Sequence, residues 1–148
     1  MEKTEVRFYT QVPDTLLKFA VIVSRHNGKW VLCRHRDRTS WECPGGHREP
    51  GELIEKTARR ELWEETGAEE YTLSPVCVYS VRGNDGGIAD SEETFGMLYL
   101  AEISAFGDLP PLEIQEVQLF ARLPENWTYP EIQPHLLQKI KEAAGIAD

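Results

Sequence analysis

The chain has few cysteines and no long apolar run, and both shortages narrow its class. Its three cysteines, Cys33, Cys43 and Cys77, are odd in number and lack metal-site spacing. We therefore expect buried free thiols in a reducing compartment rather than a disulfide framework. The longest apolar run, 19–23, is far too short to cross a membrane. Residues 1–14 are charged and lack a signal peptide's apolar core, so we expect a cytoplasmic protein with no membrane partner.

Basic residues are also scarce, with 16 Lys and Arg against 25 Asp and Glu, a net charge of −9. This balance argues against binding to a nucleic acid backbone but not against a small phosphorylated ligand. Six of the basic residues fall between Arg25 and Arg48, opposed only by Asp37 and Glu42. The segment is either a solvated basic loop or a phosphate-binding one. In the second case, we expect a guanidinium fork from one of three residues to contact phosphate: Arg34, Arg36 or Arg38.

No repeat, linker or low-complexity segment divides the 148 residues, which predicts one globular domain over 1–148. Apolar patterning predicts strands at 19–24, 29–34, 71–81, 93–103 and 116–122, with helices at 52–66 and 131–144. Asn27-Gly28 predicts a hairpin turn, and 82–87 a flexible loop. The first helix is expected to bury Ile54, Ala58, Leu62 and Trp63, and the second Ile132, Leu136, Leu137 and Ile140. Strands interleaved with two helices indicate an α/β fold.

Three glutamates cluster in the last turns of the first predicted helix, just before Gly67, a natural C-terminal capping residue. Their spacings of three and four place Glu61, Glu64 and Glu65 on one helical face, where like charges repel. The negative end of the helix dipole adds to the repulsion. A solvated acidic helix end is the simple interpretation. A hard divalent cation such as Mg²⁺, bound by oxygen ligands, would also relieve the arrangement.

A glycine turn precedes this helix. Trp41 to Gly46 are interpreted as a short strand that runs into Gly45-Gly46, where glycine permits close backbone approach and positive φ. A loop that leads into a helix N-terminus can present its backbone amides and carbonyls to a phosphate or a metal.

Together these features form a spaced motif: Gly46, five residues, Glu52, seven residues, Arg60-Glu61-Leu62, one residue, Glu64-Glu65, one residue, Gly67-Ala68. This resembles the Nudix box, which ends on a bulky aliphatic where this chain has Ala68. All seven fixed-type positions match, over residues 46–68. The resemblance implies the Nudix α/β/α sandwich, a single domain with a mixed central sheet.

The resemblance also implies roles. The carboxylates of Glu61, Glu64 and Glu65, with the carbonyl of Gly45, are expected to bind Mg²⁺, for which Mn²⁺ can substitute. Glu52 and Arg60 are expected to form a supporting pair that fixes the helix against the loop. Gly45 and Gly46 are expected to contact substrate.

Nudix proteins often recruit a further carboxylate as metal ligand or general base. The candidates are Glu116, which we favour, Glu92 and Glu93, each of which could be an ordinary surface carboxylate. Trp41 or Phe8 could stack on a base, although packing is the simpler role for either. A homodimer is an open alternative to a monomer.

Within the family, the chain looks most like MutT-type nucleoside triphosphate pyrophosphohydrolases, on residues 28–33 and 119–126. The implied activity is Mg²⁺-dependent cleavage of a nucleoside triphosphate, with an oxidised purine such as 8-oxo-dGTP as a candidate, to monophosphate and pyrophosphate. Other family substrates are ADP-ribose, dinucleoside polyphosphates and RNA 5′ ends. A nucleotide-sensing domain without turnover is disfavoured by the intact glutamates. Isoprenoid diphosphate isomerisation is disfavoured because Cys43 and Cys77 offer no clear Cys–Glu pair.

Overall fold

One mixed seven-stranded sheet forms the centre of the molecule. A computed structural model describes residues 4–83 and 92–147. The strands are β1 (Glu5–Tyr9), β2 (Leu17–His26), β3 (Lys29–His35), β4 (Gly45–His47), β5 (Ala68–Arg82), β6 (Glu93–Phe106) and β7 (Ile114–Phe120). Six of them lie in the order β1-β5-β6-β2-β3-β7, and β4 pairs with β2 beside this path. The β2–β6 pair is parallel and the other pairs are antiparallel.

The central strand β2 explains how β4 joins the sheet. One edge of β2 pairs with β6 along most of its length. The other edge pairs first with β4, where Ala20 lies opposite Gly46, and then with β3, where Ser24 lies opposite Val31. This shared edge places the glycines of β4 beside the middle of the sheet.

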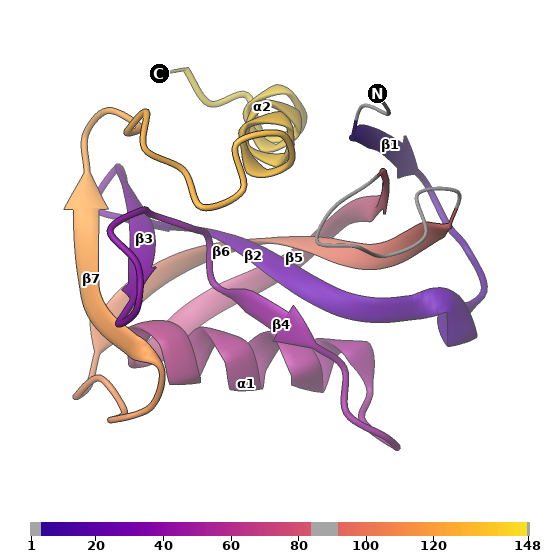
Figure 1. The fold of residues 1–148 in the computed structure, drawn as a ribbon. Helices are drawn as coiled ribbons and strands as arrows, with labels where there is room; N and C mark the ends of the chain where they lie inside the picture. The colour runs from indigo at the N-terminus through magenta and orange to yellow at the C-terminus, as the bar shows by residue number, and fades with distance from the viewer. Residues whose placement is uncertain (1–3, 84–91, 148) are drawn as a thin grey trace.

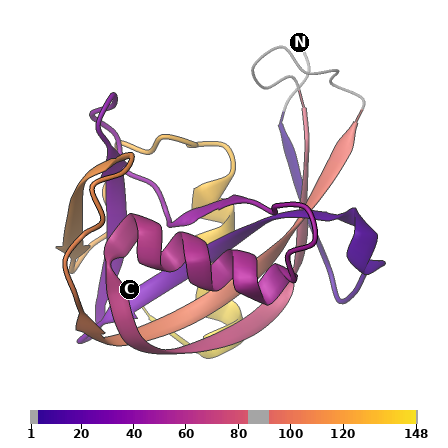
Figure 2. The same cartoon turned by 90° about the horizontal axis from the view of Figure 1, so that it is seen from below.

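Two helices cover opposite faces of the sheet, α1 (Ile54–Thr66) below and α2 (Gln133–Ala144) above in Figure 1. Figure 2, viewed from below, shows α1 lying across the strands. Ala58 and Leu62 of α1 pack on Ile22 and Val31, whereas Leu136 of α2 belongs to the opposite apolar cluster. A short 3-10 turn, η1 (Asp14–Leu16), precedes β2.

The predicted α/β/α sandwich with a mixed sheet is confirmed, as are the five predicted strands; four of them are longer than predicted, and β7 lies two residues earlier than predicted. Gly67 ends α1 in the left-handed conformation at φ 76°, as expected. Both helices begin two residues later than predicted; Pro134 lies in the first turn of α2, where its missing N–H costs least.

One buried residue was predicted wrongly. Trp63 is 48% exposed, because it points about 100° away from Leu62 around the helix while Glu61 occupies the buried stripe. Most of the predicted loop at 82–87 lies outside the described residues. In the part of the chain that the structure describes, no helix is long and apolar enough to span a membrane.

Candidate metal and phosphate site

The acidic cluster of helix α1 begins on the buried side of the helix, which includes the charged residue Glu61. Ala58 and Leu62 are fully buried against the sheet, and Glu61, on the same side, is only 9% exposed. The carboxylate of Glu61 lies directly against Gly46: a Cβ placed on Gly46 would lie 2.2 Å from its Oε2. Glycine is therefore needed at position 46 for close approach.

The sequence also associated Gly45 and Gly46 with positive φ, which is wrong. Both lie in β4 with ordinary extended pairing to β2, and neither has a positive φ. Glycine is needed at position 45 for close packing as well, because a Cβ there would lie 2.6 Å from the carbonyl oxygen of Ala20. The glycine turn is therefore a short strand that bridges β2 and α1.

Arg60 connects α1 to the segment before it through a two-point ion pair with Glu52. Its Nε lies 2.7 Å from Glu52 Oε2, and its Nη2 donates to Glu52 Oε1 at 3.0 Å. Hydrogen bonding from Arg60 lowers the pKa of Glu52 to about 2. Arg60 Nη2 also donates to the carbonyl of His47 at 3.0 Å. The guanidinium therefore ties α1 to the end of β4, which is the supporting geometry that a metal site requires.

The same guanidinium reaches two of the clustered glutamates. Its Nη1 lies 2.9 Å from Glu61 Oε2 and 3.5 Å from Glu64 Oε1. Glu65 lies on the other side and accepts a hydrogen bond from the Gly45 amide at 2.9 Å. Among the described residues, no Lys or Arg lies within 4.0 Å of the Glu65 carboxylate.

Burial and crowding make these carboxylates hard to ionise. Burial raises the pKa of Glu61 to about 7, and the charge of Glu64 adds to the shift while Arg60 opposes it. Burial raises the pKa of Glu65 to about 9, opposed by the Gly45 amide and reinforced by the charges of Glu61, Glu42 and Glu113. A nearby cation would reverse both shifts.

The donor set fits a hard divalent cation. Three carboxylates gather on one helical face, two of them are largely buried, and one guanidinium is their only cationic contact in the described ranges. Oxygen ligands of this kind suit Mg²⁺ or Mn²⁺. Within those ranges no three His, Cys, Asp or Glu side chains are positioned to hold a metal ion together; the Glu61 carboxylate contacts Arg60, and the Glu65 carboxylate accepts from the Gly45 amide.

A fourth carboxylate faces this cluster, and the sequence did not single it out. Glu113, just before β7, lines a cavity of about 220 Å³ with Glu64 and Glu65. Its side chain is 76% exposed, and its Oε2 lies 3.8 Å from His35 Nε2. Acidic residues at 113 and 116 look alike in sequence. Only the strand register, which shifts between Arg34 and His35, decides which of them faces α1.

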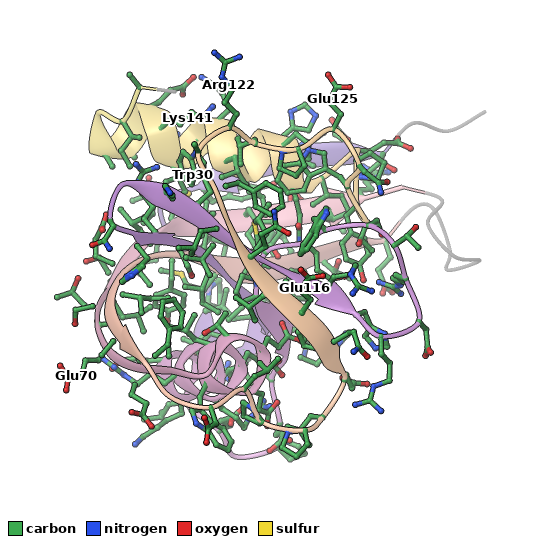
Figure 3. All side chains as sticks on the ribbon, turned by 90° about the vertical axis from the view of Figure 1, so that its left-hand side faces the viewer. Trp30, Glu70, Glu116, Arg122, Glu125 and Lys141 are labelled. Carbon is green, nitrogen blue, oxygen red and sulfur yellow. The ribbon has the colours of Figure 1, made fainter. Side chains whose placement is uncertain are left out.

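Glu116, the favoured outside carboxylate, lies within β7, the strand nearest the viewer in Figure 3. Its Oε1 pairs with Arg34 Nη2 at 3.1 Å, directly across the β3–β7 ladder. Glu93 accepts short hydrogen bonds from Tyr9 and Ser80 at 2.5 Å, and Glu92 is exposed before β6. None of these three lines the cavity beside Glu64 and Glu65.

The three candidate arginines are held by other protein groups. Arg34 pairs with Glu116, and Arg36 donates to the carbonyl of Leu112. Arg38 lies 3.4 Å from Glu42 and 3.4 Å from the Tyr129 hydroxyl, and its side chain is 43% exposed. Arg36 and Arg38 are exposed and Arg34 is not, so Arg34 is the least available of the three to a ligand.

The aromatic residues named from sequence pack within the protein. Trp41 contacts the Phe120 ring edge-on at 5.0 Å, and Phe8 lies under Lys139 beside the α2 core. The thiols of Cys33, Cys43 and Cys77 are free and buried, as expected. Glu42 was not predicted as a site residue, although it is buried two residues before Pro44.

Known proteins share both sequence and fold with this chain. A model of the NUDIX domain family matches residues 15–139. A Bacillus subtilis protein named "Putative 8-oxo-dGTP diphosphatase YtkD" is 33% identical over 139 residues, covering 87% of this chain and 84% of that protein. The crystal structure of the Bacillus subtilis pyrophosphohydrolase BsRppH has a TM-score of 0.78 at 29% identity, covering 99% of this chain and 94% of that one.

A more distant structure, the NUDIX domain of Shewanella oneidensis NrtR complexed with ADP ribose, shares the fold alone. It has a TM-score of 0.65 at 17% identity and covers 89% of this chain and 92% of that one. The family match spans most of the sequence and includes α1 with its glutamates. The chain therefore belongs to the NUDIX domain family, whose members are pyrophosphohydrolases that act on phosphoanhydride bonds.

Proposed function

We propose that this protein hydrolyses a nucleoside triphosphate to a nucleoside monophosphate and pyrophosphate, with Mg²⁺ as its metal and Mn²⁺ as a substitute. The observation that carries the proposal is the cluster of buried Glu61, partly buried Glu65 and neighbouring Glu64, which Arg60 and the β4 glycines contact. Three acidic groups at a helix C-terminus are poorly balanced by one arginine, and a divalent ion supplies the missing charge.

Five residues of the Nudix box, together with Gly45, have parts in this proposal. The carboxylates of Glu61, Glu64 and Glu65 and the carbonyl of Gly45 hold the metal. When bound, a divalent ion neutralises charge on the phosphate oxygens and makes a bound water more acidic. Glu52 and Arg60 hold α1 in a fixed position against β4, so that the metal ligands on the two elements keep their relative positions.

The proton of the attacking water needs an acceptor near the metal ligands. We assign this role to Glu113, because it lines the cavity beside Glu64 and Glu65. A new bond forms between the water oxygen and one phosphorus of the α–β anhydride, the bond from that phosphorus to the bridging oxygen breaks, and the monophosphate and pyrophosphate separate, with the bridging oxygen on the leaving group. The water proton passes to the Glu113 carboxylate. Glu116 stays an alternative, although it would first have to leave Arg34.

One relative supports a nucleoside triphosphate substrate. The YtkD name refers to 8-oxo-dGTP, whereas the name of BsRppH, a pyrophosphohydrolase, specifies no nucleotide. Local positive charge is weaker support than the sequence suggested, because Arg34 and Arg36 are engaged within the protein. Free buried thiols support a cytoplasmic location as part of the same proposal.

A substrate panel with Mg²⁺ tests the proposal. It compares kcat/KM for GTP, 8-oxo-dGTP, ATP, ADP-ribose, diadenosine tetraphosphate and a 5′-triphosphorylated RNA oligonucleotide. We expect nucleoside triphosphates to be hydrolysed best. If any other class exceeds every triphosphate by tenfold, about 1.4 kcal/mol, the substrate assignment is wrong while diphosphate hydrolysis stands. Tight binding with no turnover of any substrate would instead identify a sensing domain.

A further inference from the structure

A second cavity, of about 300 Å³, lies on the opposite face of the sheet from α1 and extends to the start of α2. Its apolar walls include Phe19, Val21, Tyr79 and Leu136. The rings of Phe19 and Tyr79 lie 5.4 Å apart. The cavity is at the small end of the range for ligand sites, roughly 300–1,000 Å³, and suits one flat ring system better than a whole nucleotide.

Strand β4 connects this cavity to the acidic cluster. Gly45 and Gly46 line the cavity, and Gly46 also lies against the Glu61 carboxylate. A ring held in the cavity is therefore one strand away from Glu61. For a nucleotide, the base would occupy the cavity while the phosphate chain passes β4 toward the glutamates of α1. This assignment of the cavity rests on the proposed function.

Two largely buried polar side chains line the cavity, and they differ in what they offer. The Glu42 side chain is 11% exposed; its Oε1 lies 3.4 Å from Arg38 Nη1, a long contact, and Thr128 is a further hydrogen-bond partner. Gln133 is 5% exposed, and its Oε1 accepts a hydrogen bond from the Cys43 amide at 2.8 Å. That bond fixes the Gln133 amide, and within residues 4–83 and 92–147 its Nε2 donates to no protein acceptor. The cavity thus presents a carboxylate acceptor and an amide donor.

Further hydrogen-bond donors would stabilise the Glu42 carboxylate. Burial raises its pKa, and Thr128, Arg38 and His35 oppose that shift only in part. A buried carboxylate is costly unless donors satisfy its oxygens. A ligand with two adjacent N–H groups would satisfy both oxygens at once.

We propose that Glu42 and Gln133 select a guanine base. The N1–H and N2–H₂ groups of guanine would donate to Glu42, and the O6 atom would accept from Gln133 Nε2. Adenine presents an acceptor at N1, which would face the carboxylate, and a donor at N6. A site built around polar groups rejects an analogue that leaves those groups unpaired.

The same edge makes two graded distinctions. Hypoxanthine retains N1–H and O6 but lacks the N2 amine, so it should bind more weakly than guanine and more strongly than adenine. Oxidation at C8 leaves N1, N2 and O6 in place. Glu42 should therefore favour guanine and 8-oxoguanine alike over adenine.

Binding without turnover tests this selectivity. GMP, IMP and AMP are titrated into the full chain in the presence of chelator, using calorimetry. We expect GMP to bind at least about tenfold more tightly than AMP, about 1.4 kcal/mol, with IMP between them. Glu42→Gln should bring the GMP and AMP affinities within a few-fold of each other by weakening GMP binding. The exposed Glu70→Gln, on β5 and outside the cavity lining, removes the same charge and should change neither affinity.

A second variant protects the test against a folding defect at position 42. Gln133→Glu keeps an oxygen for the Cys43 amide and replaces the donor with a carboxylate oxygen. It should therefore also reduce the preference for GMP over AMP.

Equal affinities of the wild type for GMP and AMP would overturn the proposal. So would the absence of saturable GMP binding up to about 10 mM, because a dissociation constant above that value means a binding free energy weaker than about −3 kcal/mol. Equal weakening of both nucleotides by Glu42→Gln would also overturn it, because it would show that Glu42 only supports the loop. Selective GMP binding without hydrolysis of any triphosphate would refute the proposed function instead.

Discussion

Replacing each glycine of β4 by alanine, one at a time, distinguishes an effect on the metal site from an effect on the stability of the fold. The Cβ of Gly46→Ala would lie 2.2 Å from Glu61 Oε2 and 2.3 Å from its carboxyl carbon, more than 1 Å inside ordinary contact at 3.4 Å. The end of a Glu side chain can swing away, so the fold should accept the change. The substitution should instead displace the Glu61 carboxylate, a proposed metal ligand.

The magnitude follows from the displacement. A shift of about 1 Å at a catalytic group costs on the order of 10²-fold in rate, which is about 2.7 kcal/mol of transition-state stabilisation. The melting temperature in chelator should change by less than about 4 °C, since a stability change of 1 kcal/mol corresponds to about 2–4 °C in a chain of this size class. Mn²⁺ binding, measured by calorimetry, should also weaken.

Gly45→Ala is the matched control, because its Cβ would meet backbone rather than a flexible side chain. The new atom would lie 2.6 Å from the carbonyl oxygen of Ala20 and 3.1 Å from the Cα of Val21. Overpacking of this kind costs about 1–3 kcal/mol, or about 2–12 °C in melting temperature. Full activity of Gly46→Ala would refute the role given to the Gly46–Glu61 contact, as would a loss of stability in chelator as large as that of Gly45→Ala.

Three further predictions concern the carboxylates. Glu64→Gln should lower kcat/KM at least about 10²-fold in the steady-state assay, without lowering the melting temperature of the metal-free protein; a variant that retains full activity would remove Glu64 from the mechanism. In chelator, the free energy of unfolding should fall as pH rises from about 5 to about 9. Folding raises the pKa of Glu61 to about 7 and of Glu65 to about 9 from an ordinary 4.5, so the folded state binds more protons than the unfolded state in that window. Urea melts at several pH values measure this dependence: Glu65→Gln should make it weaker, and a rise in stability with pH would contradict it. Glu113→Gln should lower kcat more than Glu116→Gln, with KM nearly unchanged; a larger loss at Glu116 would return the proton acceptor to β7.

The fold and the acidic cluster followed from sequence for clear physical reasons. Glu61, Glu64 and Glu65 are brought together by helical spacing alone, and Gly67 marks the end of that helix. Such local rules do not depend on the rest of the chain. The strands with β-branched apolar runs, such as 19–24, were recognised for the same reason.

What sequence missed depends on contacts between distant segments. Strand β4 contains two glycines with little strand propensity, and it forms because β2 offers a free edge at Ala20 and Val21. The placement of Glu113 beside α1 depends on a register shift in the β3–β7 ladder. Glu42 lines a cavity whose other walls include residues of β2, β4, β5, β6 and α2. Neither residue differs in sequence from an ordinary surface glutamate.

The most direct test of metal-dependent hydrolysis is the ³¹P NMR spectrum of GTP incubated with the protein and Mg²⁺. We expect GMP and pyrophosphate to appear in equal amounts and their formation to stop when excess chelator is added. Release of orthophosphate and GDP, or hydrolysis that continues undiminished in chelator, would contradict the roles assigned to Glu61, Glu64 and Glu65.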